Sequence, residues 1–222
     1  MDLESFNTSR ESLVPLLALN NKSNKNIIIF PTDKEAIEFS TDFSNLNKNI
    51  FHLPSWDTLS YDSFVPSFDI QGKRLEIAHL LLTNNNYNIA TSIKAISQRI
   101  YFEELEICKI ELNEEIDFDS LIENLIHLKY QRKDRVESKG SFAVRGGQLD
   151  VYPINYDLPL RVIFDGDLVN EIKTFDTISQ RSVSEKKDIL IVPATELFQI
   201  KHSDILNLSS NKKENLDDYE LF

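Results

Sequence analysis

Basic side chains gather between residues 129 and 145 and carry the clearest chemical signal in the chain. Lys129, Arg132, Lys133, Arg135, Lys139 and Arg145 stand there against Asp134 and Glu137. The 222-residue chain as a whole has a formal net charge of -12. Guanidinium groups form paired, charge-assisted hydrogen bonds with carboxylates. The stretch therefore predicts a docking site for an acidic protein surface, or else a charged hairpin that meets only solvent.

A β-hairpin is expected to position the end of this stretch. Apolar and polar residues alternate over Phe142–Arg145 and again over Leu149–Tyr152, on the two sides of a Gly-Gly pair. The alternation indicates half-buried strands, and the glycines indicate a tight turn or a bulge. Ala143 and Arg145 lie two residues apart, so we expect them to face the same side.

The charge of the whole chain argues against nucleic-acid binding, because a net charge of -12 repels a phosphate backbone. A single-strand binder that stacks bases on Tyr130 and Phe142 beside the basic residues is an alternative that this charge disfavours.

Catalytic and metal-binding patterns are not recognisable. Cys108 is the single cysteine, so it has no intrachain disulfide partner, and the four histidines lack the spacing of zinc ligands. Neighbouring acids such as Glu103-Glu104 and Glu114-Glu115 do not face one another, so they indicate solvated faces. We expect no catalytic residue, no metal and no cofactor.

Export and membrane signals are not recognisable either. The first residues lack a cationic start followed by an apolar core, and no run approaches the roughly 18 to 20 apolar residues that span a bilayer. We expect a cytoplasmic protein without membrane contact.

Strands and helices are expected to alternate through residues 1–106. The apolar run Ile27–Phe30 is typical of a buried strand, and a helical pattern follows over Lys34–Phe43 with Thr32 or Asp33 as its N-cap. The alternation predicts an α/β domain with a parallel sheet. The other helices are expected at Ser12–Leu19, Arg74–Leu82 and Ser92–Ile100, and the other strands at Ile50–Leu53 and Tyr87–Ala90.

The pattern changes near residue 107 to short strands around one helix, Asp119–Leu128, which predicts an α+β domain over residues 107–192. Asp165-Gly166-Asp167 predicts a hairpin turn between two of the strands. Residues 193–222 contain a predicted helix, Thr195–Ile205, and a polar tail. Besides the hairpin strands, strands are expected at Ile107–Glu111, Leu160–Phe164 and Glu171–Phe175.

The hairpin also carries a family resemblance. Tyr130–Arg132 and Gly140–Pro153 are similar to the strings Y-x-R and G-x-F-x-V-R-G-x-x-x-D-[VI]-[FY]-P of domain 2 in the excision-repair subunit UvrB and in the bacterial transcription-repair coupling factors, Mfd. Phe175–Ser182 resembles the string F-[DE]-x-x-[ST]-Q-R-[ST]. UvrB usually has a threonine-glycine turn at this position, so the resemblance favours the coupling factors. The other similar strings are Leu53–Asp62, Asp69–Leu75 and Ala95–Arg99.

The resemblance implies a fold of both α/β and α+β character. Residues 1–106 would form a degenerate P-loop-NTPase-like domain with a parallel sheet, called 1a. Residues 107–192 would be an inserted α+β domain 2 that interacts with UvrA, and residues 193–222 would begin domain 1b.

The resemblance also implies the docking residues. Arg132 and Arg145 match arginines of UvrB that face UvrA, whereas a third arginine position is Ala143 and an acidic position is Ile163. The residues expected at the periphery of the surface are Arg161 and Tyr130.

The stretch that corresponds to the nucleotide loop of UvrB lacks the residues of a phosphate cradle. It reads Asn7, Thr8, Ser9 and Arg10, without the glycines that open the backbone to phosphate and without the lysine. The expectation is a chain that is not an enzyme and binds no ATP. A fragment of a UvrB-type ATPase is the alternative.

Members of the coupling-factor family continue into an RNA-polymerase-interaction domain and a DNA translocase, whose motifs do not occur in this sequence. RNA polymerase and double-stranded DNA are therefore expected as partners only through domains missing here. We expect a fragment or a naturally short form of such a protein.

Overall fold

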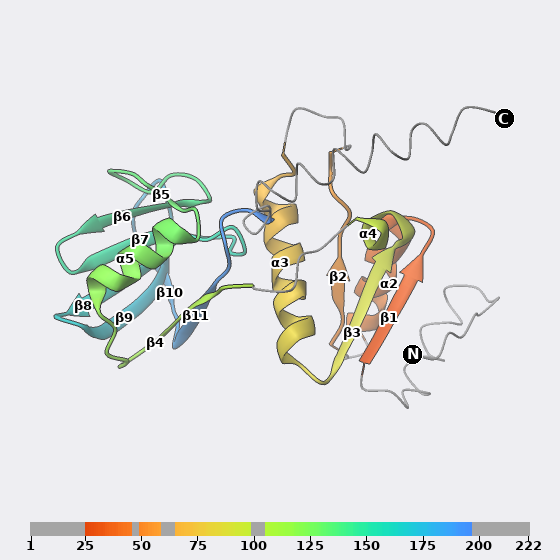
Figure 1. The fold of residues 1–222 in the computed structure, drawn as a ribbon, viewed down its shortest axis with the longest axis horizontal. Helices are drawn as coiled ribbons and strands as arrows, with labels where there is room; N and C mark the ends of the chain where they lie inside the picture. Colours follow the sequence, from red (N-terminus) through yellow and green to blue (C-terminus); the bar gives the residue numbers. More distant parts are fainter. Residues whose placement is uncertain (1–24, 46–48, 59–64, 99–104, 197–222) are drawn as a thin grey trace, which may run out of the picture.

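The computed structural model describes residues 25–45, 49–58, 65–98 and 105–196, and its fold is mixed α/β. Helix α3 (Phe68–Thr83) lies in the middle of the molecule (Figure 1). A small parallel sheet with two further helices lies on one side of α3, and a larger antiparallel part lies on the other. The described elements of the parallel part end at Ser97, and those of the antiparallel part begin at Cys108.

The small sheet has three parallel strands in the order β1-β3-β2. These are β1 (Lys25–Phe30), β2 (Phe51–Leu53) and β3 (Tyr87–Ser92), as the apolar runs predict. β3 is the central strand, because both other strands pair with it. The register with β1 begins at Lys25↔Tyr87, and the register with β2 begins at Phe51↔Ile89.

Helix α2 (Asp33–Ser44) follows β1 and covers the sheet. Its expected N-cap is confirmed, since Thr32 Oγ1 accepts a hydrogen bond from the Glu35 amide at 3.3 Å. The rings of Phe30 and Phe39 lie 5.0 Å apart at their centroids, in a buried cluster with Phe43. The helical spacing predicted for this segment therefore places Phe39 and Phe43 in the buried cluster.

Two helices differ in length from their predicted ranges. α3 begins at Phe68 rather than Arg74, because the face of its first turns buries Gln71 and Gly72, which do not show as an apolar pattern. α4 (Ile93–Ser97) ends earlier than predicted, and the Ser92 hydroxyl caps its start by accepting from the Ala95 amide at 3.0 Å.

The larger part is built on a six-stranded sheet in the order β10-β9-β8-β7-β6-β5. Its neighbours are antiparallel except for β5, which runs parallel to β6. β5 has two residues and was not predicted. The strands are β5 (Gln131–Arg132), β6 (Ser141–Arg145), β7 (Gln148–Tyr152), β8 (Leu160–Asp165), β9 (Leu168–Phe175) and β10 (Ser182–Glu185).

One face of this sheet forms the main core. Helix α5 (Phe118–His127) packs there, together with the two-stranded sheet of β4 (Cys108–Glu111) and β11 (Asp188–Ile191). The alternating strand residues Phe142, Leu149 and others on this face are fully buried. This region therefore combines one helix with a six-stranded and a two-stranded sheet.

The predicted hairpin is present as β6 and β7. Arg145 pairs with Gln148 in register, which leaves a two-residue turn with Gly146 at φ +59. A Cβ added at Gly147 would lie 2.8 Å from the carbonyl oxygen of Phe164 on β8. One glycine therefore supplies the turn conformation and the other a close approach of two backbones.

The Asp165-Gly166-Asp167 turn is also confirmed. Asp165 pairs with Leu168, and Gly166 has φ +60. The predicted helices at Ser12–Leu19 and Thr195–Ile205 fall wholly or largely outside the described residues, as does the nucleotide-loop stretch of Asn7, Thr8, Ser9 and Arg10.

Candidate protein-docking site

The exposed segment Arg132–Arg135, which we name the basic arm, carries three basic residues beside Asp134 and leaves the sheet at its edge. Arg132 pairs with Phe142 in the parallel β5–β6 register, and its side chain is exposed. The Lys133 amide donates to the carbonyl oxygen of Phe142 at 2.8 Å. The short β5 strand thus fixes the start of the arm against β6.

Arg145 lies at the end of β6 and is exposed. Its Nη2 donates to the Asp134 carbonyl oxygen at 2.9 Å, so the guanidinium holds the basic arm beside the hairpin. Within the described part of the chain Arg145 forms no ion pair. Its other N–H groups can therefore meet a carboxylate of a partner.

Ala143, at the position of the third UvrB arginine, is buried. It is 3% exposed and packs with Val136 and Phe175. Ile163 is half-buried, paired with Gln148 and Glu171 on the neighbouring strands. The open part of this surface is therefore the Arg145 end of β6 together with the basic arm.

Arg161 has an internal partner. Its Nε and Nη2 donate to the two carboxylate oxygens of Asp150 at 2.7 and 2.8 Å, and its guanidinium lies 4.4 Å from the Phe175 ring centroid. The hydrogen bond to Asp150 raises the pKa of Arg161. Its side chain is 16% exposed, so Arg161 binds mainly inside the molecule, to Asp150 and the Phe175 ring.

Tyr130 does not lie at the periphery of a docking surface, contrary to the expectation from the resemblance. It is 3% exposed, in the main core, and its hydroxyl donates to the Val192 carbonyl oxygen at 2.8 Å. Burial raises the pKa of this phenol. The aromatic ring of the Y-x-R string therefore anchors the segment after β11 rather than a partner.

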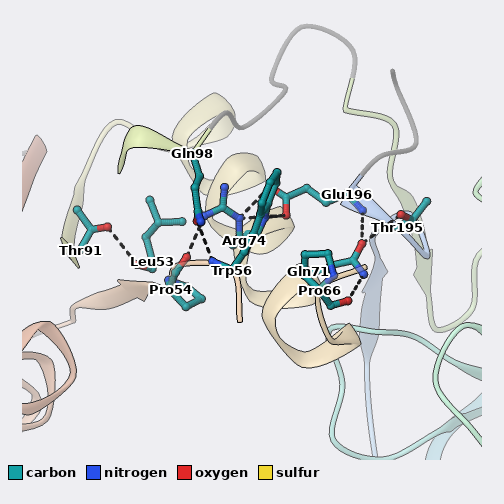
Figure 2. Close-up of polar contacts among 10 residues, drawn as sticks. All are labelled: Leu53, Pro54, Trp56, Pro66, Gln71, Arg74, Thr91, Gln98, Thr195 and Glu196. Carbon is teal, nitrogen blue, oxygen red and sulfur yellow. Dashed lines mark hydrogen bonds and ion pairs between the residues drawn. The ribbon is translucent and has the colours of Figure 1, made fainter. Parts of the chain in front are cut away.

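A second polar cluster joins the two parts of the molecule at α3 (Figure 2). The Glu196 carboxylate accepts from Arg74 Nε at 2.8 Å and from Trp56 Nε1 at 2.8 Å. Gln71 Oε1 accepts from the Glu196 amide at 2.8 Å, and Trp56 N donates to Gln98 Oε1 at 2.7 Å. We name Trp56, Gln71, Arg74, Gln98 and Glu196 the junction cluster.

The junction cluster explains three of the strings that carried the resemblance. Trp56, Arg74 and Gln98 come from Leu53–Asp62, Asp69–Leu75 and Ala95–Arg99, and the structure brings them together. Their role here is structural. Sequence reasoning did not single out Glu196, since one acid at the start of a predicted helix carries no local pattern that indicates a distant partner.

A cavity of about 560 Å³ lies between β2 and α3, and its polar lining includes His52, Lys73, Glu76 and His79. Burial raises the pKa of Glu76 and lowers those of both histidines.

Among the described residues, histidine, cysteine and acidic side chains form no group of three that could hold a metal. No helix in the described ranges is both long and apolar enough to cross a membrane.

Comparison with known proteins shows which proteins this chain is similar to. Residues 108–197 match the family model of the UvrB interaction domain. The chain is 29% identical over 174 residues to the transcription-repair-coupling factor of Escherichia coli (strain K12), covering 77% of this chain and 15% of that protein. It is 32% identical over 159 residues to that of Myxococcus xanthus, covering 70% and 13%. The chain matches the UvrB-like N-terminal module of the transcription-repair-coupling factors.

UvrB itself is a further relative. The UvrABC system protein B of Thermosipho africanus is 25% identical over 190 residues, 78% of this chain and 28% of that protein. The chain spans only about 13 to 15% of the length of the two coupling factors named above. Arg132, Arg145 and the basic arm all lie inside the part that matches the UvrB interaction domain.

Proposed function

We propose that this chain is a UvrA-docking module and that Arg132 and Arg145 bind carboxylates on UvrA. The observation that carries the proposal is the exposed Arg145, hydrogen-bonded to the basic arm inside a region that matches the UvrB interaction domain. Arginine forks recognise carboxylates through two parallel hydrogen bonds. A locally basic surface on a chain of net charge -12 selects an acidic protein partner over DNA.

The role of such docking would be to bring excision repair to RNA polymerase stalled at DNA damage, as the name of the related coupling factors suggests. Contacts with RNA polymerase and double-stranded DNA would belong to parts of those proteins that do not align with this chain. We infer a cytoplasmic location for this activity.

For the three-stranded parallel sheet we propose a degenerate P-loop-like domain without nucleotide chemistry. The support is the parallel β1-β3-β2 order together with the absence of a glycine-lysine phosphate loop at Asn7, Thr8, Ser9 and Arg10. The chain would then have no enzymatic activity and no cofactor.

Alanine substitution of the two arginines tests the docking proposal. Arg132→Ala and Arg145→Ala should each weaken UvrA binding by about 2 kcal/mol or more, about 30-fold in Kd, because each removes charge-assisted hydrogen bonds from an interface. The melting temperature should stay close to that of the unaltered chain, since both side chains are exposed. Calorimetric titration with UvrA and a thermal melt measure the two quantities.

Lys187→Ala is the matched control, since Lys187 is exposed and lies outside the basic arm. Unchanged UvrA affinity in both arginine variants would contradict the docking assignment. A loss of melting temperature that parallels the loss of binding would assign the arginines a structural role instead.

A UvrB-type ATPase is the second candidate, because UvrB of Thermosipho africanus is also similar to the chain. The proposed degenerate loop predicts a flat calorimetric titration with Mg-ATP, because both the phosphate cradle and its lysine are missing. A saturable isotherm with micromolar affinity would favour the ATPase.

A further inference from the structure

The loop between β9 and β10, Asp176–Arg181, is held closed by its own hydrogen bonds. The Asp176 amide donates to the Arg181 carbonyl oxygen at 3.0 Å, and the Gln180 amide donates to the Asp176 carbonyl oxygen at 2.8 Å. The Asp176 carboxylate accepts from the Ser179 amide at 2.7 Å, and that bond lowers the pKa of Asp176. The loop is thus preorganised rather than loosely extended.

An apolar side chain stands on this closed loop. Ile178 is 87% exposed, the highest value among the large exposed apolar residues that the structure describes, and Val183 on the adjoining β10 is 60% exposed. Single exposed apolar residues are common on protein surfaces. Ile178 differs from them because a hydrogen-bonded loop holds its exposed side chain in place beside a predicted docking surface.

The loop is bonded to the basic arm. Arg135 Nη2 donates to the carbonyl oxygen of Thr177 at 2.8 Å and to that of Ile178 at 3.5 Å. The arm meets Arg145 at Asp134, as described above. From beneath, Arg161 Nη2 donates to Gln180 Oε1 at 3.3 Å. Arg145, the basic arm and Ile178 therefore form one continuous surface.

We propose that Ile178 is the apolar anchor of the docking surface and enters a hydrophobic pocket on the partner, next to the acidic groups that bind Arg132 and Arg145. The inference rests on the proposed function, so the partner is UvrA. Interfaces concentrate their binding free energy in a few anchors that fill pockets inside a polar rim. A preorganised loop also loses little conformational freedom when it binds.

The test compares two exposed isoleucines of the same region. Ile178→Ala should weaken UvrA binding about tenfold or more, because the anchor loses most of its apolar surface. Ile126→Ala is the control: Ile126 is 52% exposed but lies on α5, which packs on the opposite face of the six-stranded sheet. Its Kd for UvrA should stay unchanged, and the melting temperatures of both variants should stay near that of the unaltered chain.

Salt dependence gives a second readout that a structural role would not produce. Raising the salt to about 0.5 M should reduce the effect of Arg145→Ala, because counterions screen exposed charges, and should leave the effect of Ile178→Ala in place. Wild-type affinity of Ile178→Ala, with weakened Arg132→Ala and Arg145→Ala, would overturn the anchor and leave the proposed function standing. No UvrA binding by the unaltered chain would overturn the proposed function itself.

Discussion

At the scale of single residues, the buried ion pair between Arg74 and Glu196 dominates the polar interactions of the junction cluster. The two side chains are 0% and 5% exposed. Removing both charges from water is costly, and the Trp56 indole and the Pro54 carbonyl oxygen offset this cost by bonding the pair. Burial raises the pKa of Glu196, and the pairing with Arg74 reduces this effect without cancelling it.

Arg74→Met should lower the free energy of unfolding by about 3 to 5 kcal/mol, because it leaves the Glu196 carboxylate buried without its cation. The double variant Arg74→Met, Glu196→Met should lose less than Arg74→Met alone, since it removes both charges. Urea denaturation of Arg74→Met, Glu196→Met and the double variant measures the three losses. A double variant whose loss equals the sum of the two single losses would show that the charges do not interact.

Cys108 shows what burial does to a single reactive group. The residue is 4% exposed, and burial raises the pKa of its thiol to about 11. Reaction requires the thiolate, which would be about one part in 10³ at pH 8. We expect a thiol-specific colorimetric reagent to label the native chain very slowly and to label one thiol at once after denaturation. Rapid labelling of the folded chain would contradict the placement of β4 in the core.

At the scale of elements, α3 decides how the two parts meet. Its first turns carry Gln71 and Arg74 of the junction cluster, and Gly72 lies against the backbone of the residues that follow β7. A glycine inside a helix is unfavourable by itself, so its presence here reflects this close approach. Lys139 adds an ion pair to Asp69 at 2.5 Å from the other part.

Gly72→Ala tests the close approach, because helix propensity and packing predict opposite signs. Propensity alone would raise the stability by about 1 kcal/mol. An added Cβ, however, would lie 2.4 Å from the carbonyl oxygen of Ile154, so we expect a loss of about 1 to 3 kcal/mol in chemical denaturation. Lys73→Ala, at an exposed position of the same helix, is the control. A stabilised Gly72→Ala variant would refute the contact.

At the scale of the whole molecule, the apolar cores are mostly separate but not completely so. The main core draws only on residues from 108 onward, and two smaller clusters draw only on the parallel sheet and its helices. A fourth cluster combines Leu75 of α3 with Ile154 and Val192. Cutting the chain at the predicted boundaries, after residues 106 and 192, would therefore separate residues that pack together.

We still predict that the second region folds alone, and the structure sharpens its C-terminal limit. The Ala194 amide donates to the Leu128 carbonyl oxygen at 2.8 Å, and Ala194 belongs to the main core. A chain of residues 107–196 should melt cooperatively, and one of residues 107–192 should be less stable by about 1 kcal/mol, the value of one such hydrogen bond. If neither of these two chains shows a cooperative transition, the region depends on α3 for its folding.

The sequence by itself determined the local features. The strand alternation, the glycine pair and the N-cap Thr32 act over a few residues, so their pattern predicted β6, β7 and the start of α2 correctly. The exposure of Arg145 follows from its place at a hairpin end. The family resemblance, read from short strings, also did not depend on knowing the fold.

Only the tertiary structure decided which polar residues face inward. Tyr130 and Arg161 were predicted at the edge of a docking surface, yet Tyr130 is buried in the main core and Arg161 pairs with Asp150. Glu196 meets Arg74 across 122 positions of sequence. The physical reason is that the burial of a polar group depends on the partner that packs against it, and the fold alone brings that partner near.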